Sequence, residues 1–181
     1  MIYVFLADGF EETEALTTVD ILRRASLDVR TVAVKKEGTL VTSSHNITVS
    51  ADINQNDITE ENLEGVILPG GRPGTLNLEN SAVVVEYTAY CADNNLIIGA
   101  ICAAPSVLGK MNILNGKKAT CFPGFEKELT GAVCTGMHTE TDGNVITAKG
   151  AGCALAFGHA IISYILSKEA ADKVMSDMQC F

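Results

Sequence analysis

The sequence predicts an α/β protein built on a mostly parallel sheet with helices on both faces. Short apolar runs rich in Val, Ile and Leu recur along the chain, each bounded by Gly, Asp, Asn or Pro, as in strands buried on both faces. Segments of helical period separate these runs, and such alternation favours parallel pairing. The 181 residues are 47% hydrophobic and 19% charged, which is typical of one globular domain. We therefore expect a single domain over residues 1–181.

The individual elements follow from these patterns. Strands are expected at Ile2–Ala7, Val29–Val34, Gly65–Leu68, Leu96–Ile101 and Val145–Ala148. Helices are expected at Glu12–Ala25, Ser81–Asp93, Cys153–Leu166 and from Ser167 or Lys168 to near Met178. The segment Leu40–Asp52 alternates apolar and polar residues and predicts a small antiparallel hairpin on the main sheet.

Charge and cysteine usage narrow the functional class. A net charge of −9 disfavours strong binding to nucleic acid or anionic membrane. The first apolar run is too short for a signal peptide and lacks its basic flank, and no stretch is long enough to span a bilayer, so a cytoplasmic location is expected. The six cysteines are scattered without metal-ligand spacing, which predicts reduced thiols and no metal.

The most informative local feature is the abrupt end of an apolar run at Cys102, followed by Ala103, Ala104 and Pro105. This pattern predicts a strand that turns into a helix with the cysteine at the corner. Pro105 suits an early helical position, where no N–H is needed. Free N–H groups at the helix start favour a thiolate, so we expect the pKa of Cys102 well below about 8.5. An ordinary buried cysteine is the alternative interpretation.

Two further loops follow predicted strands and meet the same sheet edge. Gly70 and Gly71 lie in a glycine-rich segment that lacks the spacing of a nucleotide-binding motif, so no cofactor is expected. Adjacent glycines let backbone N–H groups approach a reacting atom, as an oxyanion hole requires; the alternative, which the pattern alone favours slightly, is a tight turn that needs positive φ. Glu11, Glu12 and Glu14 begin the first helix, where acidic residues favour the helix dipole; one turned toward Cys102 would have a raised pKa and could move protons.

The sequence does not indicate a catalytic role for any of the three histidines. His45, His138 and His159 fall in the expected hairpin, a loop and a late helix, and none is placed beside the cysteine by the sequence. His159 fits a packed core position better than a catalytic base.

Three motifs in order give the chain a family resemblance: Asp8 to Glu14 (DGFEETE), Leu68 to Gly71 (LPGG) and Ala100 to Pro105 (AICAAP). Over nearly its whole length the chain resembles the ThiJ/PfpI superfamily, in the branch of the parkinsonism-associated deglycase. The resemblance implies a flavodoxin-like sandwich and a homodimer. It also implies a nucleophile at Cys102 served by Glu14, with backbone N–H groups from Gly71 and Ala103 and a turn allowed by Gly70.

The resemblance extends to the pocket and shows departures from the family. Arg24 matches a family arginine near a dimer-linked pocket, and His45 holds the place of a second one. The protease-like branch carries a histidine directly after its cysteine, where this chain has Ala103, so peptidase activity is disfavoured. Phe122, next to Cys121, stands where the deglycase branch often has a histidine.

Two functions are compatible with these residues. The first is an enzyme of the glutathione-independent glyoxalase or deglycase type that converts a dicarbonyl such as methylglyoxal, or its early amine adducts, into a hydroxy acid through Cys102. The second is a redox-sensing or chaperone-like protective protein in which Cys102 is oxidised. Cys121 is either a resolving thiol for that oxidation or a structural thiol.

Overall fold

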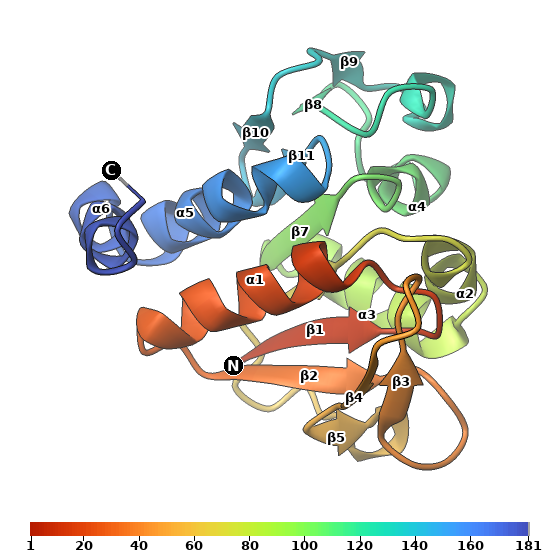
Figure 1. Cartoon of the computed structure of the whole chain (residues 1–181). Coiled ribbons are helices and arrows are strands. Elements are labelled where there is room, and N and C mark those ends of the chain that lie inside the picture. Colours follow the sequence, from red (N-terminus) through yellow and green to blue (C-terminus); the bar gives the residue numbers. More distant parts are fainter. Residues whose placement is uncertain (181) are drawn as a thin grey trace.

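A seven-stranded sheet between two layers of helices forms the centre of the computed structural model, which describes residues 1–180 (Figure 1). The strands lie in the order β10-β11-β7-β6-β1-β2-β5. Their bounds are β1 Ile2–Leu6, β2 Val29–Ala33, β5 Ile53–Asn54, β6 Gly65–Leu68, β7 Ile97–Ile101, β10 Thr139–Asp142 and β11 Val145–Ala148. Neighbouring strands pair in parallel except β10, which is antiparallel to β11. The predicted mostly parallel sheet is therefore confirmed.

The strand order determines where a site can form. From β1 the chain moves outward through β2 to β5, then returns to β6 on the other side of β1 and continues outward through β7 to β11. The direction thus reverses between β1 and β6. In open α/β sheets, ligands bind beside the carboxyl ends of the strands at such a reversal.

Helices cover both faces of the sheet (Figure 1). One layer holds α1 Glu12–Arg24, α5 Ala154–Ile165 and α6 Lys168–Asp177, and the other holds α2 Gly74–Glu79, α3 Ala82–Asp93 and α4 Pro105–Lys110. The sheet also divides the buried apolar residues into two clusters, one under each helix layer. Alternate residues of β1 contribute to each, because successive strand side chains point to opposite faces: Val4 packs with the α1 layer, and Phe5 with the α3 layer.

Local capping explains where the main helices begin. Glu11 accepts a hydrogen bond from the Glu14 N–H at 2.7 Å and caps α1. Ser81 and Ser167 cap α3 and α6 in the same way. Pro105 occupies the first turn of α4, as predicted.

The segment predicted as a hairpin differs from the expectation in its attachment. β3 Leu40–Thr42 and β4 Thr48–Ser50 do pair antiparallel, but they form a separate two-stranded sheet. The residues that follow, β5, join the main sheet beside β2 instead. The hairpin is therefore confirmed, and its placement on the main sheet was wrong.

Several short elements were not predicted. They are α2, the edge strands β5 and β10, the two-residue pair β8 Lys118–Ala119 and β9 Val133–Cys134, and the 3₁₀ turns Gln55–Asp57, Glu126–Glu128 and Ala151–Cys153. Strands of two residues are too short for a period to appear in the sequence. Among the described residues, no helix is both long and apolar enough to cross a membrane.

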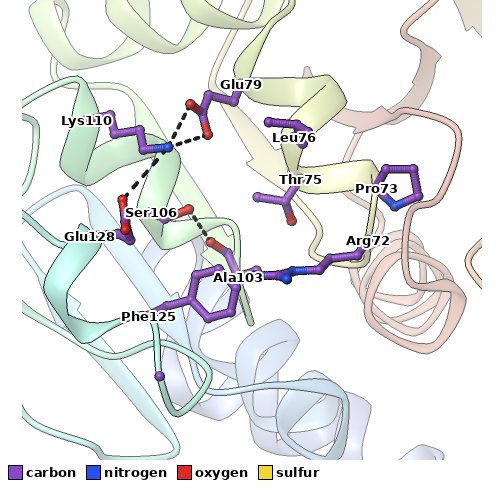
Figure 2. A pocket seen from close by; sticks show the side chains of 11 residues that line it. Arg72, Pro73, Thr75, Leu76, Glu79, Ala103, Ser106, Lys110, Phe125 and Glu128 are labelled. Atoms are coloured by element: carbon purple, nitrogen blue, oxygen red, sulfur yellow. Dashed lines mark hydrogen bonds and ion pairs between the residues drawn. The ribbon is translucent and has the colours of Figure 1, made fainter.

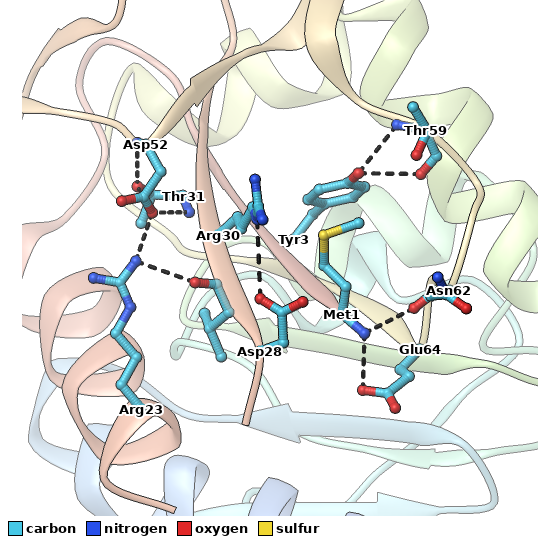
Figure 3. A network of polar contacts seen from close by, with 11 residues as sticks. Met1, Tyr3, Arg23, Asp28, Arg30, Thr31, Asp52, Thr59, Asn62 and Glu64 are labelled. Carbon is cyan, nitrogen blue, oxygen red and sulfur yellow. Dashed lines mark hydrogen bonds and ion pairs between the residues drawn. The ribbon is translucent and has the colours of Figure 1, made fainter. Parts of the chain in front are cut away.

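A polar network at the amino ends of the strands connects the elements remote from the site (Figure 3). The Asp52 carboxylate accepts from the Thr31 N–H at 2.7 Å and from Arg23 Nη2 at 2.5 Å. The Tyr3 hydroxyl donates to the Thr59 carbonyl at 3.1 Å. These contacts fix loops at the amino ends of the strands, away from the carboxyl ends of β1 and β6, where the strand order reverses.

Candidate functional site

Cys102 lies at the predicted corner between β7 and α4. Its φ is 64°, a left-handed conformation that is uncommon outside glycine and that strains the backbone by about 1–3 kcal/mol. Two hydrogen bonds hold the corner: the Cys102 N–H donates to the Ala148 carbonyl at 2.9 Å, and the Phe122 N–H donates to the Cys102 carbonyl at 2.8 Å. The surrounding structure therefore imposes the elbow that aims the thiol out of the sheet edge.

Glu14 comes to the same point from the first turn of α1. Its side chain is 1% exposed. One carboxylate oxygen, Oε2, accepts from the Gly70 N–H at 2.9 Å, and the carboxyl is also hydrogen-bonded to the Cys102 thiol. Of the three acidic residues considered at this helix, Glu14 is thus the one turned inward.

The two glycines after β6 have different structural roles. A Cβ on Gly70 would lie 2.6 Å from Glu14 Oε2 and 2.7 Å from Cys102 Cβ, so only glycine allows this close approach. Gly71 has a φ of 97° and supplies the turn. The N–H groups of Gly71 and Ala103 face the Cys102 sulfur, as an oxyanion site requires. The Gly70 N–H is used by Glu14 and does not join them.

A small pocket opens over the sulfur. Its volume is about 190 Å³, and it is lined by Gly71, Arg72, Cys102, Ala103, Phe122 and Phe125. Phe122 is half exposed at its mouth. None of the three histidines lines it, and among residues 1–180 the charged group that acts on the pKa of the thiol is Glu14.

Glu14 and Cys102 are two titratable groups in contact, and each affects the pKa of the other. Burial raises the pKa of Glu14 to about 7, an effect opposed by its hydrogen bonds to Cys102 and Gly70. Burial also raises the pKa of the Cys102 thiol to about 12, and the negative charge of ionised Glu14 adds to the rise. The expectation of a low thiol pKa from helix N–H groups combined with a hydrogen-bonding acid was therefore wrong, because burial and the Glu14 charge outweigh the two N–H donors that lower the pKa.

The two groups are best described together. When the proton lies on Glu14, the carboxyl no longer carries a negative charge that repels the thiolate. Its O–H donates a hydrogen bond to the sulfur instead, so neutral Glu14 stabilises the thiolate that ionised Glu14 destabilises. The pair thus loses its first proton near pH 7 and its second near pH 12. Between those values it carries one negative charge and one mobile proton, the composition that a nucleophile with an adjacent acid/base needs.

This arrangement of elbow cysteine, buried glutamate and double glycine occurs on a chain whose residues 1–164 match the DJ-1/PfpI family. The chain belongs to the DJ-1/PfpI family. The match confirms the resemblance drawn from the three sequence motifs, and structural neighbours confirm the flavodoxin-like sandwich. A DJ-1 superfamily protein from Salmonella typhimurium, solved as a cysteine-to-alanine mutant, is 31% identical with a TM-score of 0.93 and covers 98% of this chain and 97% of that one.

Other DJ-1 proteins are similar over most of the family domain. Protein dj-1beta of Drosophila melanogaster is 32% identical over 173 residues, which cover 94% of this chain and 92% of that protein. Toxoplasma gondii DJ-1, solved in an oxidized form, is 27% identical with a TM-score of 0.93 and covers 98% and 97% of the two chains. Protein DJ-1 homolog B of Arabidopsis thaliana is 34% identical over 171 residues, but the match spans only 39% of its length.

Of the other residues expected near the pocket, three do not line it within one chain and Phe122 does. Arg24 lies at the far end of α1 and pairs with Asp20 at 2.8 Å. His45 is 67% exposed and pairs with Glu12 at 2.8 Å. Cys121 is buried beside the pocket without lining it, whereas Phe122 does line it.

The fold also creates one grouping that the sequence spacing could not show. Ligand atoms of Glu11, Glu12 and His45 lie within 4.8 Å of one another. Glu11 is already used as the α1 cap, and Glu12 as the partner of His45. These contacts therefore hold the start of α1, the helix that carries Glu14.

Sequence reasoning missed two pocket residues, Arg72 and Phe125. The Arg72 guanidinium lies 5.0 Å from the centre of the Phe125 ring. Arg72 directly follows the double glycine inside a predicted site loop, and this place was a usable signal. Phe125 lies in a segment with no predicted element, so nothing in the sequence assigned it to the site.

Proposed function

We propose that this DJ-1/PfpI protein is a cysteine-dependent, glutathione-independent glyoxalase that converts methylglyoxal or a related dicarbonyl to a hydroxy acid. The observation that carries the proposal is the buried Glu14 carboxyl hydrogen-bonded to Cys102, with its pKa raised to about 7. A general acid/base works best with a pKa near the working pH. The small pocket suits a compact carbonyl substrate.

The first step joins the substrate to the protein. The Cys102 sulfur forms a bond to the aldehyde carbon of methylglyoxal, and the carbonyl π electrons move to oxygen. The Gly71 and Ala103 N–H groups stabilise the oxyanion, which takes the proton from the pair to give a hemithioacetal. No oxidant is needed, and Glu14 is left as a carboxylate.

The second step moves hydrogen between the two former carbonyl carbons. The Glu14 carboxylate removes the proton from the carbon bonded to sulfur and gives an enediolate. Glu14 returns that proton to the neighbouring carbon, and the hydroxyl proton passes from the oxygen beside sulfur to the neighbouring oxygen, which yields a lactoyl thioester on Cys102. This isomerisation is internally balanced, since one carbon is oxidised as the other is reduced.

Water then cleaves the thioester to lactate and regenerates the thiol. Phe122 cannot accept a proton from that water, and no histidine lines the pocket. Hydrolysis is therefore the slow step, and rapid mixing should show a burst before the steady state. Early adducts of dicarbonyls with amines are the alternative substrates for the same nucleophile.

The test follows methylglyoxal loss and lactate formation with fully reduced protein and no glutathione. Wild type should form lactate in proportion to methylglyoxal consumed, and Cys102→Ser should form none. Cys91→Ser is a matched control, because Cys91 is a buried thiol outside the pocket. Lactate formation by Cys102→Ser, or none by wild type, would contradict the proposal.

A redox-sensing or protective function is the second candidate. The same N–H groups and a protonated Glu14 would hydrogen-bond the oxygens of an oxidised Cys102, and the similar Toxoplasma gondii DJ-1 was solved in an oxidized form. Peroxide would convert the thiolate to sulfenic acid, and a second peroxide would give sulfinic acid. Peptide mapping after graded peroxide tests this, with Cys102 expected to gain two oxygens before any other cysteine.

We further propose that the protein forms a homodimer through the outer face of α1 and α5. Leu16 is 37% exposed and Leu155 is 43% exposed on this face. Both line a shallow groove of about 580 Å³ that also includes Met178. Exposed apolar side chains clustered on neighbouring helices are typical of a two-fold contact.

A further inference from the structure

We propose that a second cavity, next to the Cys102 pocket, binds a small zwitterion with a carboxylate at one end and an ammonium group at the other. This cavity, named here the Arg72 cavity, measures about 640 Å³ and lies between α2, α4 and the turn around Phe125 (Figure 2). Arg72, Ala103 and Phe125 line both spaces. The inference goes beyond the proposed function, because it concerns binding and requires no reaction at Cys102.

Arg72 forms the end of the cavity that would hold the carboxylate. Its guanidinium packs on the Phe125 ring at 5.0 Å, and no carboxylate within the described chain pairs with it. Stacking on an aromatic face leaves the N–H groups at the edge of the guanidinium plane free. Those groups match the two oxygens of a carboxylate.

Thr75 supplies a second polar group at this end. The residue is 5% exposed, and its Oγ1 is shielded from water with no hydrogen-bond partner among residues 1–180. Figure 2 shows the hydroxyl on the side of Arg72 and Ala103. A buried hydroxyl without a partner is unfavourable, so a carboxylate drawn to Arg72 supplies the missing acceptor.

The opposite side of the cavity carries excess negative charge (Figure 2). Lys110 Nζ lies 2.8 and 2.9 Å from the two oxygens of Glu79 and 3.8 Å from Glu128. One ammonium between two carboxylates leaves a net charge of 1 − 2 = −1. Glu128 is the less engaged of the two, and its side chain is 49% exposed.

The two ends together favour a zwitterion over a simple anion. A cationic end and an acidic end attract opposite charges on one ligand, and each repels a ligand with the wrong charge placed there. An amino acid with a flexible chain between its charged groups has this chemistry. Its binding would bring a second molecule beside the Cys102 pocket through the shared wall of Arg72 and Phe125.

The test is an NMR titration of the full chain with three probes of the same carbon skeleton: ε-aminocaproate, caproate and hexylamine. The zwitterion should bind saturably and about tenfold more tightly than either singly charged probe. Arg72→Gln should weaken ε-aminocaproate and caproate about tenfold while sparing hexylamine. Glu128→Gln should weaken ε-aminocaproate and hexylamine while sparing caproate.

Three further variants complete the test. Lys127→Gln makes the same charge change as Arg72→Gln on an exposed residue outside the cavity lining, and should leave binding unchanged. Thr75→Val should weaken ε-aminocaproate without lowering the melting temperature, because the hydroxyl has no partner in the free protein. Cys102→Ser should bind ε-aminocaproate like wild type even if the glyoxalase proposal fails.

Three results would overturn the inference. They are the absence of saturable binding, caproate binding as tightly as ε-aminocaproate, and equal losses in Lys127→Gln and Arg72→Gln. The second result would mean a site for anions only.

Discussion

Replacing Glu14 by Gln should stabilise the folded protein at pH 8. Burial raises the pKa of Glu14 from its ordinary 4.5 to about 7, so the folded state binds more protons than the unfolded state between those values. Stability from this group is therefore full below pH 4.5 and is lost as pH rises to about 7. Glutamine stays neutral throughout and keeps an oxygen that can accept from the Gly70 N–H.

The size of the effect follows from the same two values. The difference is 7 − 4.5 = 2.5 pKa units, and at 1.36 kcal/mol per unit the ionised carboxyl costs up to about 3 kcal/mol. Glu14 is almost fully buried, so solvent screening reduces this little. For a chain of this size the gain corresponds to a melting temperature about 6–12 °C higher.

Urea unfolding of wild type and Glu14→Gln at pH 8 and pH 4.5 measures the effect. The variant should be more stable at pH 8, and most of the gain should disappear at pH 4.5. Glu61→Gln, an exposed glutamate outside the pocket, should change stability little at either pH. A variant less stable than wild type at pH 8, or a gain independent of pH, would refute the reasoning about burial.

Three further outcomes follow from the site and the outer face. Alkylation of Cys102 by iodoacetamide should rise with pH around a midpoint near 7, because loss of the pair's first proton allows the reactive form with the remaining proton on Glu14 and the charge on sulfur; a midpoint at the ordinary thiol value of about 8.5 would exclude coupling to the glutamate. Gly70→Ala should slow this alkylation and destabilise the fold by about 1–3 kcal/mol, because its Cβ would collide with the pair. Gly152→Ala, with open space around it, is the control, and equal effects of the two would contradict the steric argument. Sedimentation at micromolar concentration should show a dimer that Leu16→Glu converts to monomer, and a monomeric wild type would remove the dimer proposal.

The sequence predicted the central strands and long helices because their apolar residues form clear runs or recur at helical spacing. The runs at Ile2–Leu6 and Ile97–Ile101 are buried throughout, and every residue carries the apolar signal. β10, Thr139–Asp142, is a polar edge strand, and β5 pairs over two residues, so neither has a period that could be recognised. The position of the hairpin off the main sheet depends on tertiary contacts that alternation does not encode.

The site was predictable to the level of loops and residue types. The corner at Cys102 and the double glycine were recognisable as turns, but the choice of Glu14 over its acidic neighbours came from the family resemblance. The ionisation of the thiol was predicted with the wrong sign, because local N–H groups are visible in a sequence and burial is not. Arg72 and Phe125 were missed since their stacking joins two loops that are distant along the chain.

Glyoxalase activity at this site requires a covalent acyl intermediate on Cys102, for which Glu14 performs the proton transfers. Rapid quenching of reduced protein with methylglyoxal, followed by peptide mass spectrometry, tests it most directly. We expect a lactoyl group on Cys102 within the first turnover in wild type, and in Glu14→Gln only the reversible hemithioacetal. Lactate that appears with no acyl group on Cys102, or a lactoyl adduct formed as fast in Glu14→Gln, would contradict it.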